Sequence, residues 1–281
     1  MKSEFVDVNG VRLNYGEGAA NGPKLVFIPG FPRNWTEYGP LLEALKPYFH
    51  VFAPTMRGQG LSQWSAPYLI SSYIDDTAAF LHHIVGDSAL GVGHSAGAWF
   101  GLAAANDSPE LFTAFISLDQ PLDPNDHVAF HGKDSSPTRR MLDAMRAATS
   151  VEDLQQKLSK LPSSGGRSWS DEMSDEELRD KAVHLRSIDP ETFAPWADGL
   201  EDWIVIPELQ RWPGKYHNPL LFLDGEMNGG SMLTPKAVEY NLSHYPWAER
   251  IEMKNLDHVM GLRDTPGPAS AEIRRFFDGL S

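Results

Sequence analysis

Apolar runs alternate with helical segments along the first 120 residues. Two of the runs, KLVFI (24–28) and ALGVG (89–93), are apolar throughout, which is typical of strands buried on both faces. Segments with helical periodicity, such as 71–85 and 96–106, lie between the runs. This βαβ order predicts an α/β fold with a mostly parallel sheet and helices on both faces.

The chain opens with a predicted hairpin. FVDVNG is followed by VRLNYG, and Asn9-Gly10 between them is a favoured pair for a type I′ turn. With the two arms of this hairpin, the pattern predicts eight strands. The other six cover 24–28, 50–54, 89–93, 113–119, 219–225 and 249–253, and the accompanying helices cover 35–45, 71–85, 96–106, 235–244 and 268–278.

Residues 121–217 interrupt this rhythm, because they contain no convincing strand. Helical patterns cover 137–148, 151–160 and 174–187, and a Trp-rich tract follows at 196–212. We therefore predict a core domain of residues 1–120 and 218–281, with an inserted helical cap (lid) domain of residues 121–217.

Composition narrows the possible partners of the chain. Its 281 residues carry a net charge of −14, which disfavours nucleic acid and anionic membrane surfaces. It contains no cysteine, so disulfides and thiolate chemistry are excluded. The N-terminus lacks the apolar region of a signal peptide, and a cytoplasmic location is expected. No dinucleotide, phosphate-loop or metal-spaced motif is present, so neither a cofactor nor a metal is expected, and the chain is expected to be a monomer or a homodimer.

The segment Gly93-His94-Ser95-Ala96-Gly97 carries the main chemical signal. It fits G-x-S-x-G, follows an apolar strand and opens a helix, which is the context of a nucleophile elbow. Such a serine sits on a strained turn, and bulky side chains two residues away on either side would clash. We therefore predict that Ser95 is a nucleophile, with the Ala96 N–H directed at a developing oxyanion.

Five motifs together resemble the α/β-hydrolase fold family, in its cap-bearing branch. They are PGFPRNW (29–35), APTMRGQGLS (53–62), GHSAG (93–97), LFLDGEMN (221–228) and LDHVMGLRDTP (256–266), in the order and spacing of the family. The Pro29–Pro32 segment is similar to the H-G-x-P loop of epoxide hydrolases and haloalkane dehalogenases. Those enzymes use an aspartate nucleophile, whereas this chain has Ser95, which suits acyl transfer.

The resemblance implies that the backbone N–H of Phe31 is the second oxyanion donor, beside that of Ala96. Gly30 would allow close approach of the backbone, and Pro32 would restrict Phe31 to extended conformations. Pro29 stands where the family usually has histidine, which bears on the packing of this loop.

The base should come late in the chain, because the family order is Ser, acid, His. His217, His244 and His258 follow the predicted cap, and His258 lies in the segment that resembles the family's terminal histidine loop. We therefore predict that His258 is the base.

The acid departs from the usual place, because Asn228 occupies the slot of the usual aspartate. Some relatives place the acid after the strand that follows the nucleophile helix, and here that strand ends at Asp119. We predict Asp119 as the acid, with Glu226, Asp224 and Asp123 as alternatives. Asn228 is expected to line the site or to bond Asp119.

The predicted cap should form the roof of the site and select the substrate. The residues expected to contact substrate are Gly30, Pro32, Trp99, Met141, Trp196 and Asn228. Together these features predict a cofactor-independent serine hydrolase (esterase or lactonase) for a mid-sized hydrophobic ester or lactone. Hydrolysis of a C–C or amide bond by the same triad, and a small-molecule signalling receptor with slow hydrolysis, stay open.

Overall fold

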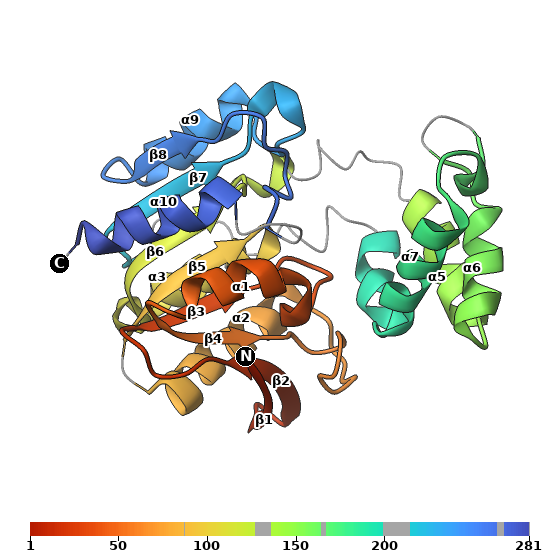
Figure 1. Ribbon diagram of the computed structural model, residues 1–281, viewed down its shortest axis with the longest axis horizontal. Coiled ribbons are helices and arrows are strands. Elements are labelled where there is room, and N and C mark those ends of the chain that lie inside the picture. The colour runs from red at the N-terminus through yellow and green to blue at the C-terminus, as the bar shows by residue number, and fades with distance from the viewer. Residues whose placement is uncertain (87, 127–135, 164–166, 199–213, 263–266, 281) are drawn as a thin grey trace.

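A computed structural model describes residues 1–86, 88–126, 136–163, 167–198, 214–262 and 267–280. One eight-stranded sheet has the order β1-β2-β4-β3-β5-β6-β7-β8 (Figure 1). Strands β1 and β2 pair antiparallel, as do β2 and β4, and every other pair is parallel. The strands are β1 (Lys2–Val8), β2 (Val11–Glu17), β3 (Lys24–Ile28), β4 (His50–Pro54), β5 (Ala89–His94), β6 (Phe112–Leu118), β7 (Leu220–Asp224) and β8 (Glu249–Glu252).

All eight predicted strands are confirmed. The hairpin of β1 and β2 turns at Asn9 and Gly10, whose φ values of 50° and 73° fit a type I′ turn. The central strands are almost completely buried, and all five residues of β7 are inaccessible. Continuous apolar runs therefore arise here from burial on both faces of a parallel sheet.

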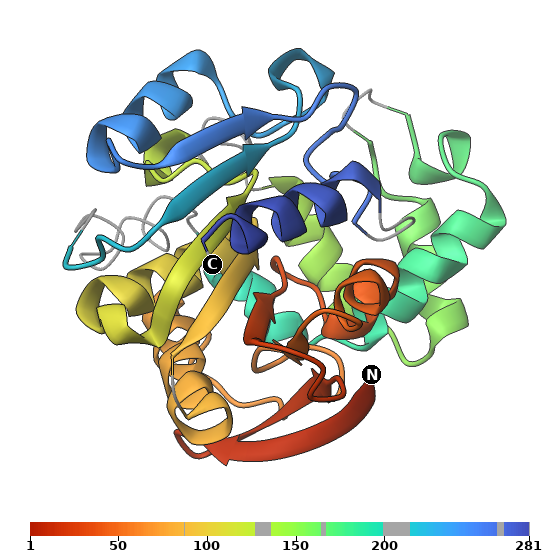
Figure 2. The same cartoon turned by 60° about the vertical axis from the view of Figure 1, so that its left-hand side comes forward.

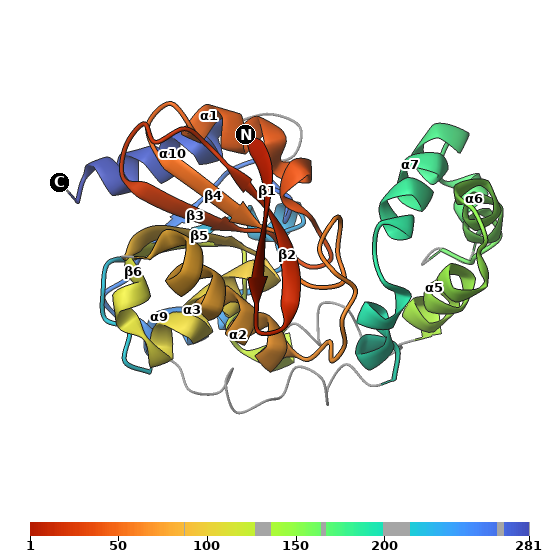
Figure 3. The ribbon, with the colours of Figure 1, turned by 90° about the horizontal axis from the view of Figure 1, so that it is seen from below.

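Helices cover both faces of the sheet, as Figure 3 shows. Helix α1 (Gly39–Leu45) and helix α10 (Gly267–Asp278) pack on one face around a common apolar cluster. Helices α2 (Ile70–Phe80), α3 (Ala96–Asp107) and α9 (Pro235–His244) cover the other face. No helix within the described ranges is long and apolar enough to cross a membrane.

Short helical turns lie between several of these elements. A π-helical turn, η2 (Leu81–Val85), extends α2 to the end of the predicted 71–85 helix. The other turns are of the 3-10 type, and they are η1 (Trp35–Tyr38), η3 (Pro109–Leu111), η4 (Trp169–Asp171), η5 (Pro190–Phe193) and η7 (Met227–Gly229).

The segment between β6 and β7 contains α5 (Ser136–Ala147), α6 (Val151–Ser159) and α7 (Asp175–Arg186). These helices form a group beside the sheet layers in Figures 1 and 2 and pack around their own apolar cluster. Further along the same segment, the Asp189 N–H donates to the Gly58 carbonyl (2.8 Å), and Tyr68 donates to the Asp189 carboxylate. Most of the Trp-rich tract at 196–212 lies outside the described residues.

Candidate active site

A strained turn at Ser95 joins β5 to α3. Ser95 has φ 52° and ψ −132°, a backbone conformation that residues other than glycine rarely adopt. The flanking glycines explain how the turn closes, because a Cβ on Gly93 would lie 2.6 Å from the Ala98 backbone. A Cβ on Gly97 would lie 2.2 Å from the Ile28 carbonyl oxygen. Both contacts are shorter than real Cβ atoms make, so the predicted steric reason for the glycines is confirmed.

The structure brings the three predicted catalytic side chains together. Ser95 Oγ lies 3.1 Å from His258 Nε2, and His258 Nδ1 lies 2.7 Å from Asp119 Oδ2. Ser95 follows β5, Asp119 follows β6, and His258 lies between β8 and α10. Carboxyl ends of parallel strands meet at one edge of a sheet, and residues distant in sequence converge there.

Asp119 is fully buried and its carboxylate accepts four hydrogen bonds. Oδ1 accepts from the Gly225 N–H (2.8 Å) and the Ser231 hydroxyl (2.6 Å). Oδ2 accepts from the Met232 N–H (3.0 Å) and from His258. Burial alone would raise the pKa of Asp119. The bonds and charge of His258, with the bonds from Ser231 and Met232, outweigh this effect and hold the pKa below its usual value.

The alternative acids bind other groups. Asp224 is buried, and its Oδ2 accepts a hydrogen bond from Arg250 Nε (2.8 Å). Burial raises the pKa of Asp224 to about 7, despite the lowering effect of that guanidinium. Glu226 accepts from the Asn255 N–H (3.0 Å). Asp123 accepts from the backbone and side chain of Asn125. Of the carboxylates weighed, Asp119 is the one that contacts His258.

Other sequence candidates lie in different surroundings. Asn228 is exposed in η7. The carboxylate of Asp119 is bonded by Gly225, Ser231 and Met232 in addition to His258, and a bond from Asn228 does not contribute to holding it. His217 packs against Trp247, with ring centroids 4.7 Å apart. His244 bonds the Tyr240 carbonyl within α9 (2.9 Å).

The loop after β3 lies directly against the elbow. A Cβ on Gly30 would lie 3.1 Å from Ser95 Cβ and 3.0 Å from His94 Nδ1, so glycine permits the close approach. The loop folds back on itself through the Arg33 N–H, which donates to the Gly30 carbonyl (2.9 Å). Pro32 follows a cis peptide bond and is half-buried. This geometry places the backbone of Gly30, the residue before Phe31, against Ser95.

Aromatic rings surround the Phe31 side chain. The centroid distances are 6.1 Å to Tyr73 of α2, 5.7 Å to Phe193 and 5.8 Å to the half-buried Trp196. Phe193 and Trp196 belong to the segment between β6 and β7, so Phe31 joins that segment to the sheet layers. Aromatic pairs at such distances are favourable beyond the area they bury.

Two further sequence candidates pack within apolar clusters. Trp99 is almost completely buried (1% exposed), and its indole N–H donates to the Pro121 carbonyl (3.0 Å). Met141 is half-buried on α5 against the apolar cluster of the inserted helices. A substrate contact by either residue stays a prediction.

Sequence reasoning missed Ser231 and Tyr38. Ser231 donates to Asp119 across 112 positions of the chain, and Tyr38 bonds His94 across 56 positions. A buried carboxylate needs several donors, which predicts that such residues exist. No local pattern at either position identifies which residue it is.

One protein family has a model that matches most of this chain. The model of the alpha/beta hydrolase family matches residues 25–270. The chain belongs to the alpha/beta hydrolase family. This confirms the resemblance seen in the five motifs and agrees with the eight-stranded sheet.

Relatives in the family are named as hydrolases that act on different substrates. N-formylmaleamate deformylase of Pseudomonas putida is 27% identical over 270 residues, which are 93% of this chain and 91% of that protein. 2-(Acetamidomethylene)succinate hydrolase of Mesorhizobium japonicum is 32% identical over 118 residues, and the match spans only 42% of either chain. The structure of the N-formylmaleamic acid deformylase from Pseudomonas putida S16 superposes with a TM-score of 0.70 at 19% identity and covers 100% of both chains.

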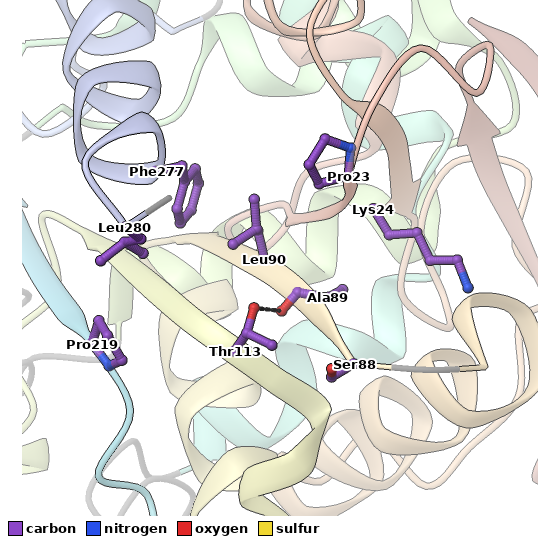
Figure 4. Close-up of a pocket in the computed structure, with 9 residues that line it drawn as sticks. All are labelled: Pro23, Lys24, Ser88, Ala89, Leu90, Thr113, Pro219, Phe277 and Leu280. Carbon is purple, nitrogen blue, oxygen red and sulfur yellow. Dashed lines mark hydrogen bonds between the residues drawn. The ribbon is translucent and has the colours of Figure 1, made fainter.

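A cavity of about 550 Å³ is lined by residues shown in Figure 4, and Ser95, Asp119 and His258 are not among them. Its lining includes Lys24, Ala89 and Thr113, which stand at or near the first residues of β3, β5 and β6. Ligands of parallel sheets bind at the opposite, carboxyl ends of the strands, where Ser95 lies. Within the described residues, no three His, Asp or Glu side chains gather as metal ligands.

Gly97 tests the steric explanation of the elbow. Gly97→Ala forces a Cβ against the Ile28 carbonyl, and we expect the free energy of unfolding to fall by about 1–3 kcal/mol in urea titrations. Gly39→Ala is the matched control, because φ is −46° there and nothing lies within 4 Å of the added Cβ. Equal stability of the two variants would contradict the steric account.

The depressed pKa of Asp119 predicts a pH dependence. Its ionised form is favoured by folding, so this stabilisation is present above the unfolded-state pKa, near 3.8, and is lost as the pH falls through the lower folded pKa. The stability advantage of the wild type over Asp119→Asn should therefore be full at pH 7 and shrink below pH 3.8. Guanidinium titrations from pH 7 to pH 3 test this, and a difference independent of pH would refute it.

Proposed function

We propose that this protein is a serine hydrolase that cleaves a carboxylic ester or lactone through an acyl-enzyme at Ser95. The observation that carries the proposal is the continuous contact from Ser95 through His258 to the buried Asp119, at 3.1 and 2.7 Å. Nucleophile, base and orienting acid in this order form the arrangement that acyl transfer uses.

The first step follows from the protonation states in this arrangement. Ionised Asp119 can only accept, so the Nδ1 proton of His258 faces it and the unprotonated Nε2 is the acceptor that faces the Ser95 hydroxyl. Nε2 takes the Ser95 hydroxyl proton as Oγ attacks the substrate carbonyl carbon. The carboxylate of Asp119 then stabilises the imidazolium that forms.

Two backbone N–H groups, of Phe31 and Ala96, would receive the oxyanion. Ala96 is the first residue of α3, where the helix dipole also favours negative charge, and the Gly30 contact with Ser95 supports the place of Phe31. Collapse of the intermediate expels the alcohol, which takes the proton from His258, and leaves an acyl group on Ser95. Water activated by His258 then releases the acid.

The substrate class is proposed from the aromatic surroundings of Phe31. Tyr73, Phe193 and Trp196 cluster around this residue, which directly follows the Gly30 that lies against Ser95. Apolar walls with a few polar groups suit a mid-sized hydrophobic acyl compound. The helices of residues 121–217 are proposed as the cap domain that carries part of this wall.

A second candidate is hydrolysis of an amide bond by the same residues. The relative that aligns over most of the chain is named a deformylase, which makes an N-formyl amide a candidate substrate. Turnover of a p-nitrophenyl ester and of an N-formyl amide, measured side by side on the same preparation, separates the two classes.

Turnover of p-nitrophenyl butyrate tests the assignment of the acid. We expect Asp119→Asn to reduce kcat by at least about 10³, because the amide cannot stabilise the imidazolium by charge. The exposed Asn228→Ala is the matched control and should lose much less. Ser95→Ala should abolish turnover. A larger loss for Asn228→Ala than for Asp119→Asn would overturn the assignment.

A further inference from the structure

A buried chain of hydrogen bonds runs behind the elbow and joins the two loops on either side of Ser95. The Gly30 N–H donates to Tyr38 Oη (3.2 Å), and Tyr38 Oη lies 2.8 Å from His94 Nδ1. At the far end, His94 Nε2 lies 2.9 Å from the backbone carbonyl oxygen of His258. Neither Tyr38 nor the His94 side chain takes part in the reaction steps proposed above.

The chemistry of the linked groups determines which atom donates and which accepts in each of these hydrogen bonds. A carbonyl oxygen only accepts, so His94 Nε2 carries a proton and donates to His258. Burial, aided by the neighbouring charge of His258, lowers the pKa of His94 to about 3, so the ring is neutral and Nδ1 is an acceptor. Tyr38 therefore donates its hydroxyl proton to Nδ1 and accepts from Gly30.

Both linking side chains are held firmly. Tyr38 is fully buried and His94 is 5% exposed. The Tyr38 ring packs 4.7 Å from Phe27, and the His94 ring lies 5.0 Å from that of His258. Every bond of the chain runs between buried or part-buried groups, where an unsatisfied donor is costly.

The two ends of this hydrogen-bond chain are loops whose relative positions matter for acyl transfer. Gly30 directly precedes Phe31, the proposed oxyanion donor, and the other end is the backbone of the proposed base. We propose that Tyr38 and His94 are positioning residues that fix the oxyanion loop and the histidine loop relative to Ser95. This inference rests on the proposed function. Neither side chain is assigned a contact with substrate, so their effect should fall on kcat.

The first test compares two buried tyrosines. Tyr38→Phe leaves the Gly30 N–H and His94 Nδ1 without this partner, and we expect kcat for p-nitrophenyl butyrate to fall about 10-fold or more. KM should stay within about twofold, because substrate contacts are unchanged. Tyr245→Phe is the control: it removes an equally buried hydroxyl, bonded to Asn106 at 3.3 Å, and should leave both constants unchanged.

The second test separates the two bonds of His94. In His94→Gln the side-chain amide can still donate to the His258 carbonyl, whereas His94→Asn is too short to reach it and keeps only an acceptor for Tyr38. We expect His94→Asn to lose about 10-fold or more in kcat and His94→Gln to lose clearly less. Equal losses would show that the bond to His258 does not position the base.

Hydrogen exchange gives a readout that needs no turnover. In Tyr38→Phe and His94→Asn, amides in residues 254–262 and 29–34 should exchange faster than in Tyr245→Phe, with the rest of the chain unchanged. No local difference, or an equal increase everywhere, would overturn the positioning role. Wild-type turnover that is absent, or that survives Ser95→Ala, would instead remove the proposed function, so the two failures are distinguishable.

Discussion

The buried carboxylate of Asp119 is the constraint around which the site is organised. A charge in an apolar interior is tolerated only with enough donors, and four groups from two separate segments supply them. Gly225, Ser231 and Met232 follow β7, and His258 follows β8. Satisfying one carboxylate therefore fixes the ends of three neighbouring strands and sets the orientation of the imidazole toward Ser95.

The strained turn at Ser95 is a second constraint on the site. Packing around the turn offsets the free-energy cost of its backbone strain. Gly93 and Gly97 allow α3 and β3 to approach the turn to distances that no side chain would permit. The loop after β3 then closes against Ser95, and Phe31 joins it to the aromatic side chains of the inserted segment. In the proposed function, the same residue thus connects oxyanion stabilisation with the surface that selects the substrate.

Local patterns predicted most of the fold, because the features concerned are determined locally. Asn9-Gly10 favours positive φ in its own right, and continuous apolar runs follow from burial on two faces. The convergence of Ser95, Asp119 and His258 was accessible through motif order and spacing. Ser231 and Tyr38 were not, because their roles arise from contacts 112 and 56 residues away. For Asn228, the slot in the motif suggested that it lines the site or bonds Asp119, whereas other groups bond that carboxylate and the Asn228 side chain is exposed.

The central claim is that Ser95 is a nucleophile activated by His258. Reaction of the protein with a fluorophosphonate, followed by peptide mass spectrometry, tests it most directly, because this reagent phosphonylates activated serines. The account predicts one adduct, on the peptide containing Ser95, formed rapidly in the wild type and lost or strongly slowed in His258→Ala. A folded wild type without an adduct, or an adduct that forms equally fast in His258→Ala, would contradict it.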